Sequence, residues 1–376
     1  MKPPLTRPKA YLKVRHKTVH DAMKELKLDA LLLTHPPDLA YLTDFTGDDS
    51  VGLITQSSLH MVTDFRYEAQ TQLEAAWVKL AIREGKMSDE LARTLADAKV
   101  ERVGFEANFT TVGQVAALEL SLKELKPSVK VVLVPVEDVM ANIRKVKDDH
   151  EIDLTRKSVA LAEEAYDAVR GEIKVGLTEN HIAGLMISEL RSRGAARTSF
   201  EPIIASGANS SLPHYRPGED VVRSGEPLLL DWGAVYRGYC SDLTRTLLVG
   251  NVGPKIREAY KVVLEAQQAA IEFLRPGVTT IQADRVARDI ITKAGYGKLF
   301  GHGLGHGIGR DIHELPTLRK QGPGEELRPG MIVTIEPGIY LPGKGGVRIE
   351  DDVLITHGGC EALSSLDRTF EGCHIE

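Results

Sequence analysis

The sequence predicts an α/β domain at the N-terminus, followed by an α+β domain with an internal repeat. Helical and β-favouring segments alternate from about residue 17 to residue 135, which is typical of α/β proteins. After them, a pattern of paired helices occurs twice, about a hundred residues apart, and strands rich in Gly and Pro turns fill the rest. A chain of 376 residues is longer than one core usually supports, so we expect two domains.

The N-terminal domain has four segments with helical patterns and five short runs that favour strands. The helical segments are residues 20–26, 67–75, 89–98 and 112–125. The expected strands are residues 30–34, 51–54, 60–63, 102–105 and 131–134. This part contains no cluster of potential ligands, so we expect a structural, oligomerisation or substrate-gating role.

A charged stretch at residues 145–151 indicates the domain boundary, which gives domains 1–145 and 146–376. A long helical pattern follows over residues 151–173. Residues 175–178 and an amphipathic run to Gly194 resemble residues 276–279 and a similar run to Gly295. We interpret this repeat as two pseudo-equivalent helix pairs behind one sheet, related by a pseudo-twofold axis. The remaining strands are expected at residues 201–204, 331–335 and 346–355.

Residues 228–249 read as a hairpin, because two apolar runs flank an Arg-Gly turn. With the turn at Arg237 and Gly238, Asp231 lies opposite Thr244, and Asp242 lies opposite Gly233. The two aspartates then share one face of the hairpin, roughly 5.5–8 Å apart. Two carboxylates this close repel, and burial of each costs several kcal/mol unless a cation or hydrogen bonds compensate; a cation is the simplest explanation. The pair therefore favours a cation site.

Composition and charge exclude several functions. A formal charge of −6 disfavours nucleic-acid binding, because phosphates require clustered Lys and Arg. The basic start, residues 1–17, is followed by no apolar stretch long enough for a signal peptide or a membrane span, so we expect a cytoplasmic protein with no membrane partner. The three cysteines lack CxxC spacing, and we expect reduced, structural thiols.

Three further stretches supply potential metal ligands. His306 lies in the glycine-rich run GHGLGHGIG, Glu336 ends an apolar strand in TIEPG, and Glu350 lies two residues after Arg348 in RIEDDVLI. Each residue alone has an ordinary explanation as a turn former, a surface histidine or half of an ion pair. Together with the aspartate pair they offer four carboxylates and one imidazole. That set suits two divalent ions, with manganese expected first and cobalt or zinc as alternatives.

These motifs resemble those of the pita-bread metallopeptidases, in the branch of Xaa-Pro dipeptidases (prolidases) and Xaa-Pro aminopeptidases. The resemblance is strong over about residues 146–358 and includes TIEPGIY and GGVRIEDDVL. The N-terminal region is similar in layout to the creatinase-type domain of that branch. The resemblance implies a pita-bread catalytic domain, a homodimer, and hydrolysis of the bond between an N-terminal residue and proline, in dipeptides or in longer peptides.

The same resemblance implies a role for each ligand. Asp231 would chelate one ion, Asp242 and Glu350 would bridge both ions, and His306 with Glu336 would complete the other site. Glu336 would also accept the proton of the attacking water and later donate it.

The resemblance also implies substrate-side residues. His214 and His313 match two non-ligand histidines that stabilise the tetrahedral intermediate and hold substrate. His302 matches a further substrate-side histidine. Arg348 is also assigned to the substrate-binding residues, and we expect it to orient Glu350 and Asp242.

Arg310 departs from the family pattern, which commonly has an apolar residue there. It would either alter substrate preference or point outward. Three alternatives to the main hypothesis share the fold: a methionine aminopeptidase-like enzyme, a metal-free amidinohydrolase of creatinase type and a non-catalytic binding protein. The extra N-terminal domain disfavours the first, and the complete ligand set disfavours the other two.

Overall fold

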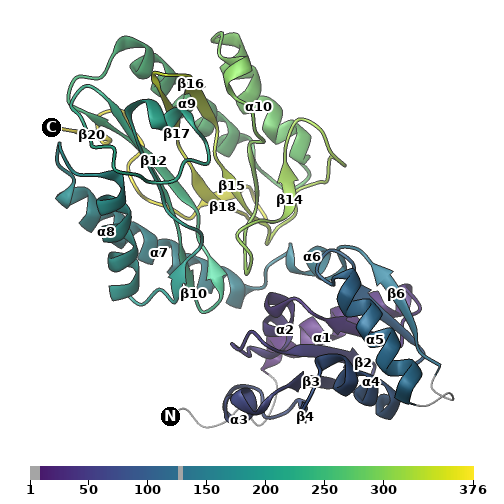
Figure 1. Ribbon diagram of the computed structural model, residues 1–376. Helices are drawn as coiled ribbons and strands as arrows, with labels where there is room; N and C mark the ends of the chain where they lie inside the picture. The colour runs from purple at the N-terminus through teal and green to yellow at the C-terminus, as the bar shows by residue number, and fades with distance from the viewer. Residues whose placement is uncertain (1–8, 126–129) are drawn as a thin grey trace. The chain divides into compact units, whose positions relative to one another are not determined.

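The computed structural model describes residues 9–125 and 130–376. The chain divides into two compact units, Met1–Ile143 and Arg144–Glu376 (Figure 1). Within the described residues, no helix is both long enough and apolar enough to cross a membrane. All three cysteines are free thiols.

The N-terminal unit is built on a six-stranded sheet with the order β4-β3-β2-β1-β5-β6. All of its strands are parallel except β2, which pairs antiparallel with both neighbours. The strands are β1 (Ala30–Leu33), β2 (Val51–Thr55), β3 (Leu59–Thr63), β4 (Lys79–Ile82), β5 (Arg102–Glu106) and β6 (Val132–Val136). The five expected strands are therefore present, and β4 is a sixth that the sequence did not predict.

Helices cover both faces of this sheet. They are α1 (Ala10–Glu25), α2 (Pro36–Thr43), α3 (Glu68–Glu74), α4 (Met87–Ala98), α5 (Val112–Leu125) and α6 (Val139–Arg144), with a short 3-10 turn η1 (Phe65–Tyr67). Residues of α1, α2 and α6 pack against one face around Leu31 and Leu33. Residues of α4 and α5 pack against the other face around Leu32 and Phe105. The alternation of side chains along each strand supplies both cores.

Two pairs of long helices lie behind the sheets of the C-terminal unit. They are α7 (Asp149–Glu172) with α8 (Glu179–Ser192), and α9 (Pro254–Phe273) with α10 (Thr280–Lys293). The turns between the paired helices are alike. Gly176 and Gly277 have left-handed φ angles of +95° and +86°. Two residues later, the side chains of Thr178 and Thr279 cap α8 and α10 by accepting a backbone N–H. The internal repeat is therefore present in the fold.

The strands of this unit form two principal sheets, ordered β20-β12-β9-β8 and β14-β13-β15-β18-β19, and two small ones, β11-β10-β7 and β16-β17. The strands are β7 (Arg197–Thr198), β8 (Ile203–Ser206), β9 (Pro227–Trp232), β10 (Ala234–Tyr236), β11 (Tyr239–Cys240), β12 (Leu243–Val249), β13 (Gly305–Gly307), β14 (Glu314–Leu318), β15 (Ile332–Ile335), β16 (Gly338–Leu341), β17 (Gly345–Arg348), β18 (Asp351–Ile355), β19 (Cys360–Ala362) and β20 (His374–Ile375). Two 3-10 turns are η2 (Gly207–Ser211) and η3 (Gly297–Leu299). A β-bridge between Thr244 and Glu350 joins the principal sheets.

The expected hairpin is confirmed, and its register is the expected one. Arg237 and Gly238 form the turn with φ angles of +49° and +83°. Asp231 pairs with Thr244 across β9 and β12. Positive φ at both central positions matches the twist of the strands, so the turn fixes the register.

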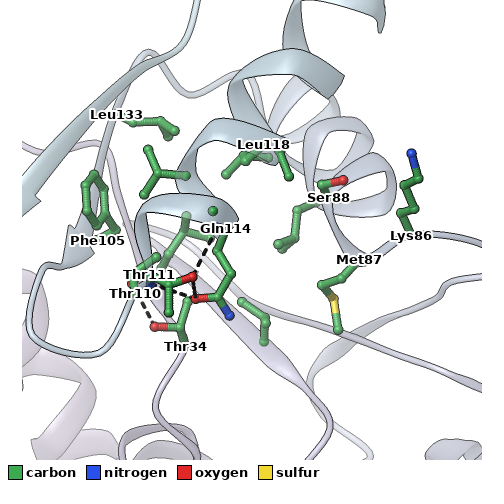
Figure 2. A pocket seen from close by; sticks show the side chains of 16 residues that line it. Thr34, Lys86, Met87, Ser88, Phe105, Thr110, Thr111, Gln114, Leu118 and Leu133 are labelled. Atoms are coloured by element: carbon green, nitrogen blue, oxygen red, sulfur yellow. Dashed lines mark hydrogen bonds between the residues drawn. The ribbon is translucent and has the colours of Figure 1, made fainter.

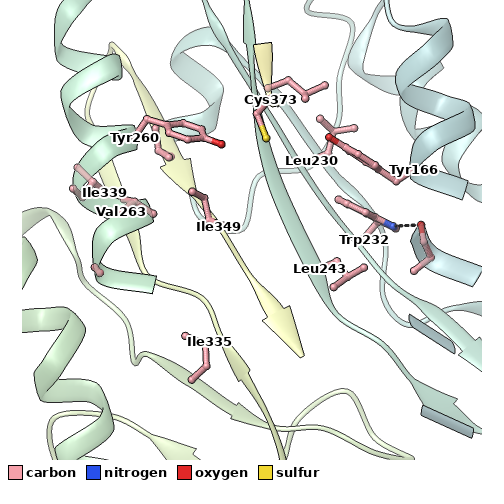
Figure 3. Close-up of a cluster of buried hydrophobic side chains, with 14 of the residues drawn as sticks. Tyr166, Leu230, Trp232, Leu243, Tyr260, Val263, Ile335, Ile339, Ile349 and Cys373 are labelled. Carbon is pink, nitrogen blue, oxygen red and sulfur yellow. Dashed lines mark hydrogen bonds between the residues drawn. The ribbon is translucent and has the colours of Figure 1, made fainter. Parts of the chain in front are cut away.

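The core of the C-terminal unit lies between the helices and the sheets (Figure 3). Tyr166 of α7 stacks on Trp232 of β9 with ring centroids 4.7 Å apart. The indole N–H of Trp232 donates to the backbone oxygen of Ala162 at 2.9 Å, so its polar atom is satisfied inside the core. This packing holds the end of β9, where Asp231 lies.

Candidate metal centre

Five strand ends bring the expected ligands together. Asp231 lies in β9, Asp242 directly before β12, His306 in β13, Glu336 directly after β15, and Glu350 between β17 and β18. All five line one cavity of about 830 Å³. Residues more than a hundred positions apart thus share one site.

Three of these side chains form a compact group that could hold a metal ion. Asp242, His306 and Glu350 each present one potential ligand atom, and the three atoms lie within 4.8 Å of one another. The Nε2 atom of His306 is 3.6 Å from Oδ2 of Asp242 and 3.7 Å from Oε1 of Glu336. The imidazole therefore faces two of the carboxylates.

His306 is held in the form that binds metals. Its Nδ1 atom lies 3.0 Å from the backbone oxygen of Gly307. Because a carbonyl oxygen can only accept, Nδ1 carries the hydrogen and Nε2 presents its lone pair to the carboxylates. Burial lowers the pKa of His306 to about 4, so the ring is neutral at neutral pH.

The negative charges of the carboxylates are not fully compensated by the described residues around them. Burial raises the pKa of Asp231, and raises the pKa values of Asp242 and Glu350 well above the ordinary range, with further increases from neighbouring acids. Burial also raises the pKa of Glu336 to about 8. Oδ1 of Asp231 is buried and has no hydrogen-bond partner within the described chain. Three buried acids, one of them with an unsatisfied oxygen, and the half-buried Glu336 fit divalent cations.

A second group of side chains holds the ligands in place. The Thr244 hydroxyl donates to Oε2 of Glu350 at 2.6 Å, and Asp352 accepts from the backbone N–H of Asp242 at 3.0 Å. Arg245 is fully buried, pairs with Asp351 at 2.7 Å and donates to the backbone oxygen of Glu350 at 2.7 Å. The supporting role of these residues was not predicted from the sequence. An arginine in the middle of an apolar strand was the available signal, because a buried guanidinium needs several acceptors.

Arg348 contacts a different carboxylate from those expected. Its guanidinium donates to Asp231, to the Tyr340 hydroxyl at 2.9 Å and to the Thr244 hydroxyl at 3.2 Å. Because the Thr244 hydroxyl in turn donates to Glu350, Arg348 is linked to Glu350 through Thr244, and its direct carboxylate partner is Asp231. The side chains of Arg348 and Asp231 face each other from adjacent strands, β17 and β9, which pack together.

His214, His302 and His313, the three histidines expected on the substrate side, line the same cavity as the expected ligands. The ring of His313 meets that of His306 edge-to-face, with centroids 4.3 Å apart. His302 contacts the Gly303 oxygen through Nδ1 and the Tyr340 hydroxyl through Nε2, each at 2.8 Å. Burial lowers the pKa of His302 to about 4 and also lowers the pKa of His313. Both rings are therefore neutral donors or acceptors at pH 7.

Arg310 does not point outward, which was one of the two possibilities that the sequence left open. It is 9% exposed, and its guanidinium lies over the ring of Tyr239, 4.7 Å from the centroid. Its Nε donates to the Tyr239 hydroxyl at 3.2 Å. Arg310 is not among the described residues that line the cavity. It packs on an aromatic ring beside the hairpin.

The fold and the buried acid cluster define a metal-dependent hydrolase. Residues 153–357 match the model of metallopeptidase family M24, and residues 15–146 match the creatinase/prolidase N-terminal domain. The chain therefore belongs to metallopeptidase family M24, and the expected family, fold and enzyme class are confirmed.

Relatives with known names cover nearly the whole chain. The Xaa-Pro dipeptidase of Pyrococcus horikoshii is 34% identical over 356 residues, which are 94% of this chain and 97% of that protein. The structure of an Xaa-Pro dipeptidase from Bacillus anthracis covers 97% of this chain and 100% of its own, with 35% identity and a TM-score of 0.91. That of an X-Pro aminopeptidase from Thermotoga maritima covers 93% and 99%, with 33% identity and a TM-score of 0.84.

Proposed function

We propose that the protein hydrolyses the peptide bond between an N-terminal residue and a following proline. Asp231, Asp242, His306, Glu336 and Glu350 would hold two divalent ions, manganese by preference. The observation that most supports this proposal is the group of buried acids around a neutral imidazole. The names of the relatives support the substrate class.

When bound, such ions polarise the scissile carbonyl and lower the pKa of water. Glu336 then accepts the proton of the attacking water and donates it to the departing proline nitrogen. Its carboxylate lies 3.7 Å from Nε2 of His306 and lines the cavity, so it faces the ligands and the substrate space together. His214 and His313 donate hydrogen bonds to the oxygen of the tetrahedral intermediate.

Proline makes this bond distinctive. Its amide has no N–H and its ring fixes φ near −65°, so a site that accepts Xaa-Pro requires no hydrogen-bond acceptor for that nitrogen before cleavage. Hydrolysis of Ala-Pro, Ala-Pro-Ala and Met-Ala-Ala after loading with manganese tests the proposal. Cleavage of Ala-Pro alone indicates a dipeptidase, and cleavage of both proline peptides an aminopeptidase. Cleavage of Met-Ala-Ala alone, or of no peptide, would contradict it.

The proposal includes a homodimer, as the family resemblance implies, and the cytoplasmic location that we expect from the sequence. Sedimentation equilibrium of the full chain should give twice the 41.2 kDa mass of one chain. A monomer mass at micromolar concentration would contradict the dimer and leave the hydrolytic proposal untouched.

Metal should stabilise the protein more at alkaline pH than at acid pH. The folded state raises the pKa values of these acids, so it binds their protons more tightly than the unfolded chain does. Their contribution to the free energy of unfolding is therefore fully present below an ordinary carboxyl pKa of about 4. It is lost as the pH rises through the folded pKa values, of which that of Glu336 is about 8. Thermal unfolding should show the metal-free Tm falling between about pH 5 and 8. Saturating Mn²⁺ should raise Tm by about 10 °C at pH 8 and by less at pH 5.5. Equal rises at both pH values would contradict the assigned ligands.

Arg319 is an exposed cation that lines the cavity, and we expect it to bind the free carboxylate of a dipeptide substrate. We expect Arg319→Met to raise KM for Ala-Pro about tenfold with kcat unchanged, because a charged hydrogen bond contributes about 1.5–3 kcal/mol. Lys320→Met is the matched control, since Lys320 is exposed and absent from the described cavity lining. Ala-Pro-amide should show no change with either variant. A tenfold KM increase for the amide would contradict carboxylate recognition.

A further inference from the structure

The N-terminal unit contains a second cavity, of about 450 Å³, which the proposed hydrolysis does not use (Figure 2). It lies between one face of the six-stranded sheet and the helices α4 and α5. Leu32, Phe105 and Leu133 line it from the sheet, and Leu91 and Leu118 line it from the helices. A cavity of this size with an apolar lining and a few polar groups is the usual form of a small-molecule site.

The topology places this cavity where α/β sheets bind ligands. From β1 the chain passes to β2, β3 and β4 on one side, and then returns to β5 and β6 on the other. The direction of winding therefore reverses between β1 and β5, which are parallel neighbours. Thr34 directly follows β1, and Thr110 follows β5, so the cavity reaches the carboxyl ends of both strands. Ligand crevices in open α/β sheets form at such a reversal.

Thr34, Thr110, Thr111 and Gln114 gather at one end of the cavity, and Lys86 and Ser88 lie across from them, as Figure 2 shows. The hydroxyls of Thr34 and Thr110 are 2.9 Å apart. Thr111 and Gln114 cap the start of α5, since the N–H of Thr111 donates to Oε1 of Gln114 at 2.8 Å and that of Gln114 to the Thr111 hydroxyl at 3.2 Å. These groups give the apolar cavity one end that can hydrogen-bond a ligand.

The charge of this cavity favours an anion. Lys86 is the one ionisable residue among the described residues that line it. The N–H groups of Val112 and Gly113, in the first turn of α5, have no acceptor in the part of the chain that the structure describes. The start of a 14-residue helix also carries partial positive charge. No acidic side chain among the described lining residues opposes them.

We propose that this cavity binds a small amphipathic monocarboxylate, with its apolar body on the leucine-lined floor and its carboxylate at the start of α5. The site is independent of the metal centre, because every residue that lines it belongs to the N-terminal unit.

Calorimetric titration of the manganese-loaded full chain with sodium octanoate tests the proposal. We expect one saturable site, and binding at least tenfold weaker in Ala117→Phe, which fills the cavity. Ala116→Phe is the matched control, because Ala116 is also exposed on α5 but is absent from the described lining. Gly113→Met is a second filling variant, since a Cβ there meets no atom closer than 3.9 Å. A circular dichroism spectrum and a thermal unfolding curve like those of the wild-type chain verify that each variant is folded.

The head group is tested separately. Octylammonium should bind at least tenfold more weakly than octanoate. Lys86→Gln should weaken octanoate binding several-fold, whereas Lys123→Gln, which changes an exposed lysine of α5 outside the described lining, should not. Octanoate binding that survives in Ala117→Phe and Gly113→Met would overturn the site, as would the absence of saturable binding to the wild-type chain. Equal binding of octylammonium would overturn the anion assignment. Self-association that Ala117→Phe abolishes would instead mean that a second copy covers the cavity.

Discussion

Glu350→Ala is expected to remove bound metal and to lower kcat/KM for Ala-Pro by at least ~10³-fold. Changing a residue that only supports a ligand typically costs 10–100-fold, and Glu350 is a proposed direct ligand. Its side chain lies in the group of ligand atoms within 4.8 Å of one another, and it accepts a hydrogen bond from Thr244 at 2.6 Å. Elemental analysis of the dialysed variant and steady-state kinetics measure both effects.

Two further variants test whether the effect of Glu350→Ala comes from lost metal binding or from misfolding. Glu350→Gln keeps the shape and the hydrogen bond but removes the charge, so it should retain the fold and still lose metal. Glu361→Ala removes an exposed glutamate that pairs with Arg156, and it should leave metal content and kinetics unchanged. Turnover at the wild-type rate in Glu350→Ala would refute the bridging assignment.

Arg245→Met should lower the free energy of unfolding by about 3–5 kcal/mol, because it leaves Asp351 buried with part of its charge uncompensated. Arg245 is fully buried, and it also donates to the Glu350 backbone oxygen and to that of Leu366 at 2.9 Å. A loss of this size lowers Tm by roughly 10 °C. Differential scanning calorimetry of the metal-loaded protein measures the shift.

Arg156→Met is the control for this loss of stability. Arg156 also pairs with a carboxylate, that of Glu361, but their side chains are 39% and 45% exposed. An exposed pair contributes at most about 1 kcal/mol. Equal losses of stability in Arg156→Met and Arg245→Met would contradict the assigned role of burial.

The elements with strong local signals could be predicted from the sequence. The hairpin register followed from a two-residue turn at Arg237 and Gly238, and the helix repeat followed from similar glycine and threonine spacing. Helix α2 (Pro36–Thr43) was missed, because it has only eight residues and is stabilised by buried Leu39 and Leu42 rather than by propensity. The start of α1 at Ala10 was also missed, ten residues before the expected helix.

The candidate site could also be predicted from the sequence only in part. The residue types of the ligands could be read from motifs, and the structure brings all five to one cavity. The partners of those ligands could not be read. Arg348 reaches Asp231 because two strands far apart in the chain, β9 and β17, pack together. Sequence spacing contains no information about that contact.

The bridge between Thr244 and Glu350 has a consequence for how the enzyme matures. Asp231 and Asp242 belong to the first copy of the duplicated motif, whereas His306, Glu336 and Glu350 belong to the second. Neither copy alone provides a complete set of donors. Tight binding of the proposed ions therefore requires that the two copies have already packed together. Metal would then stabilise the chains that have finished folding over those that have not.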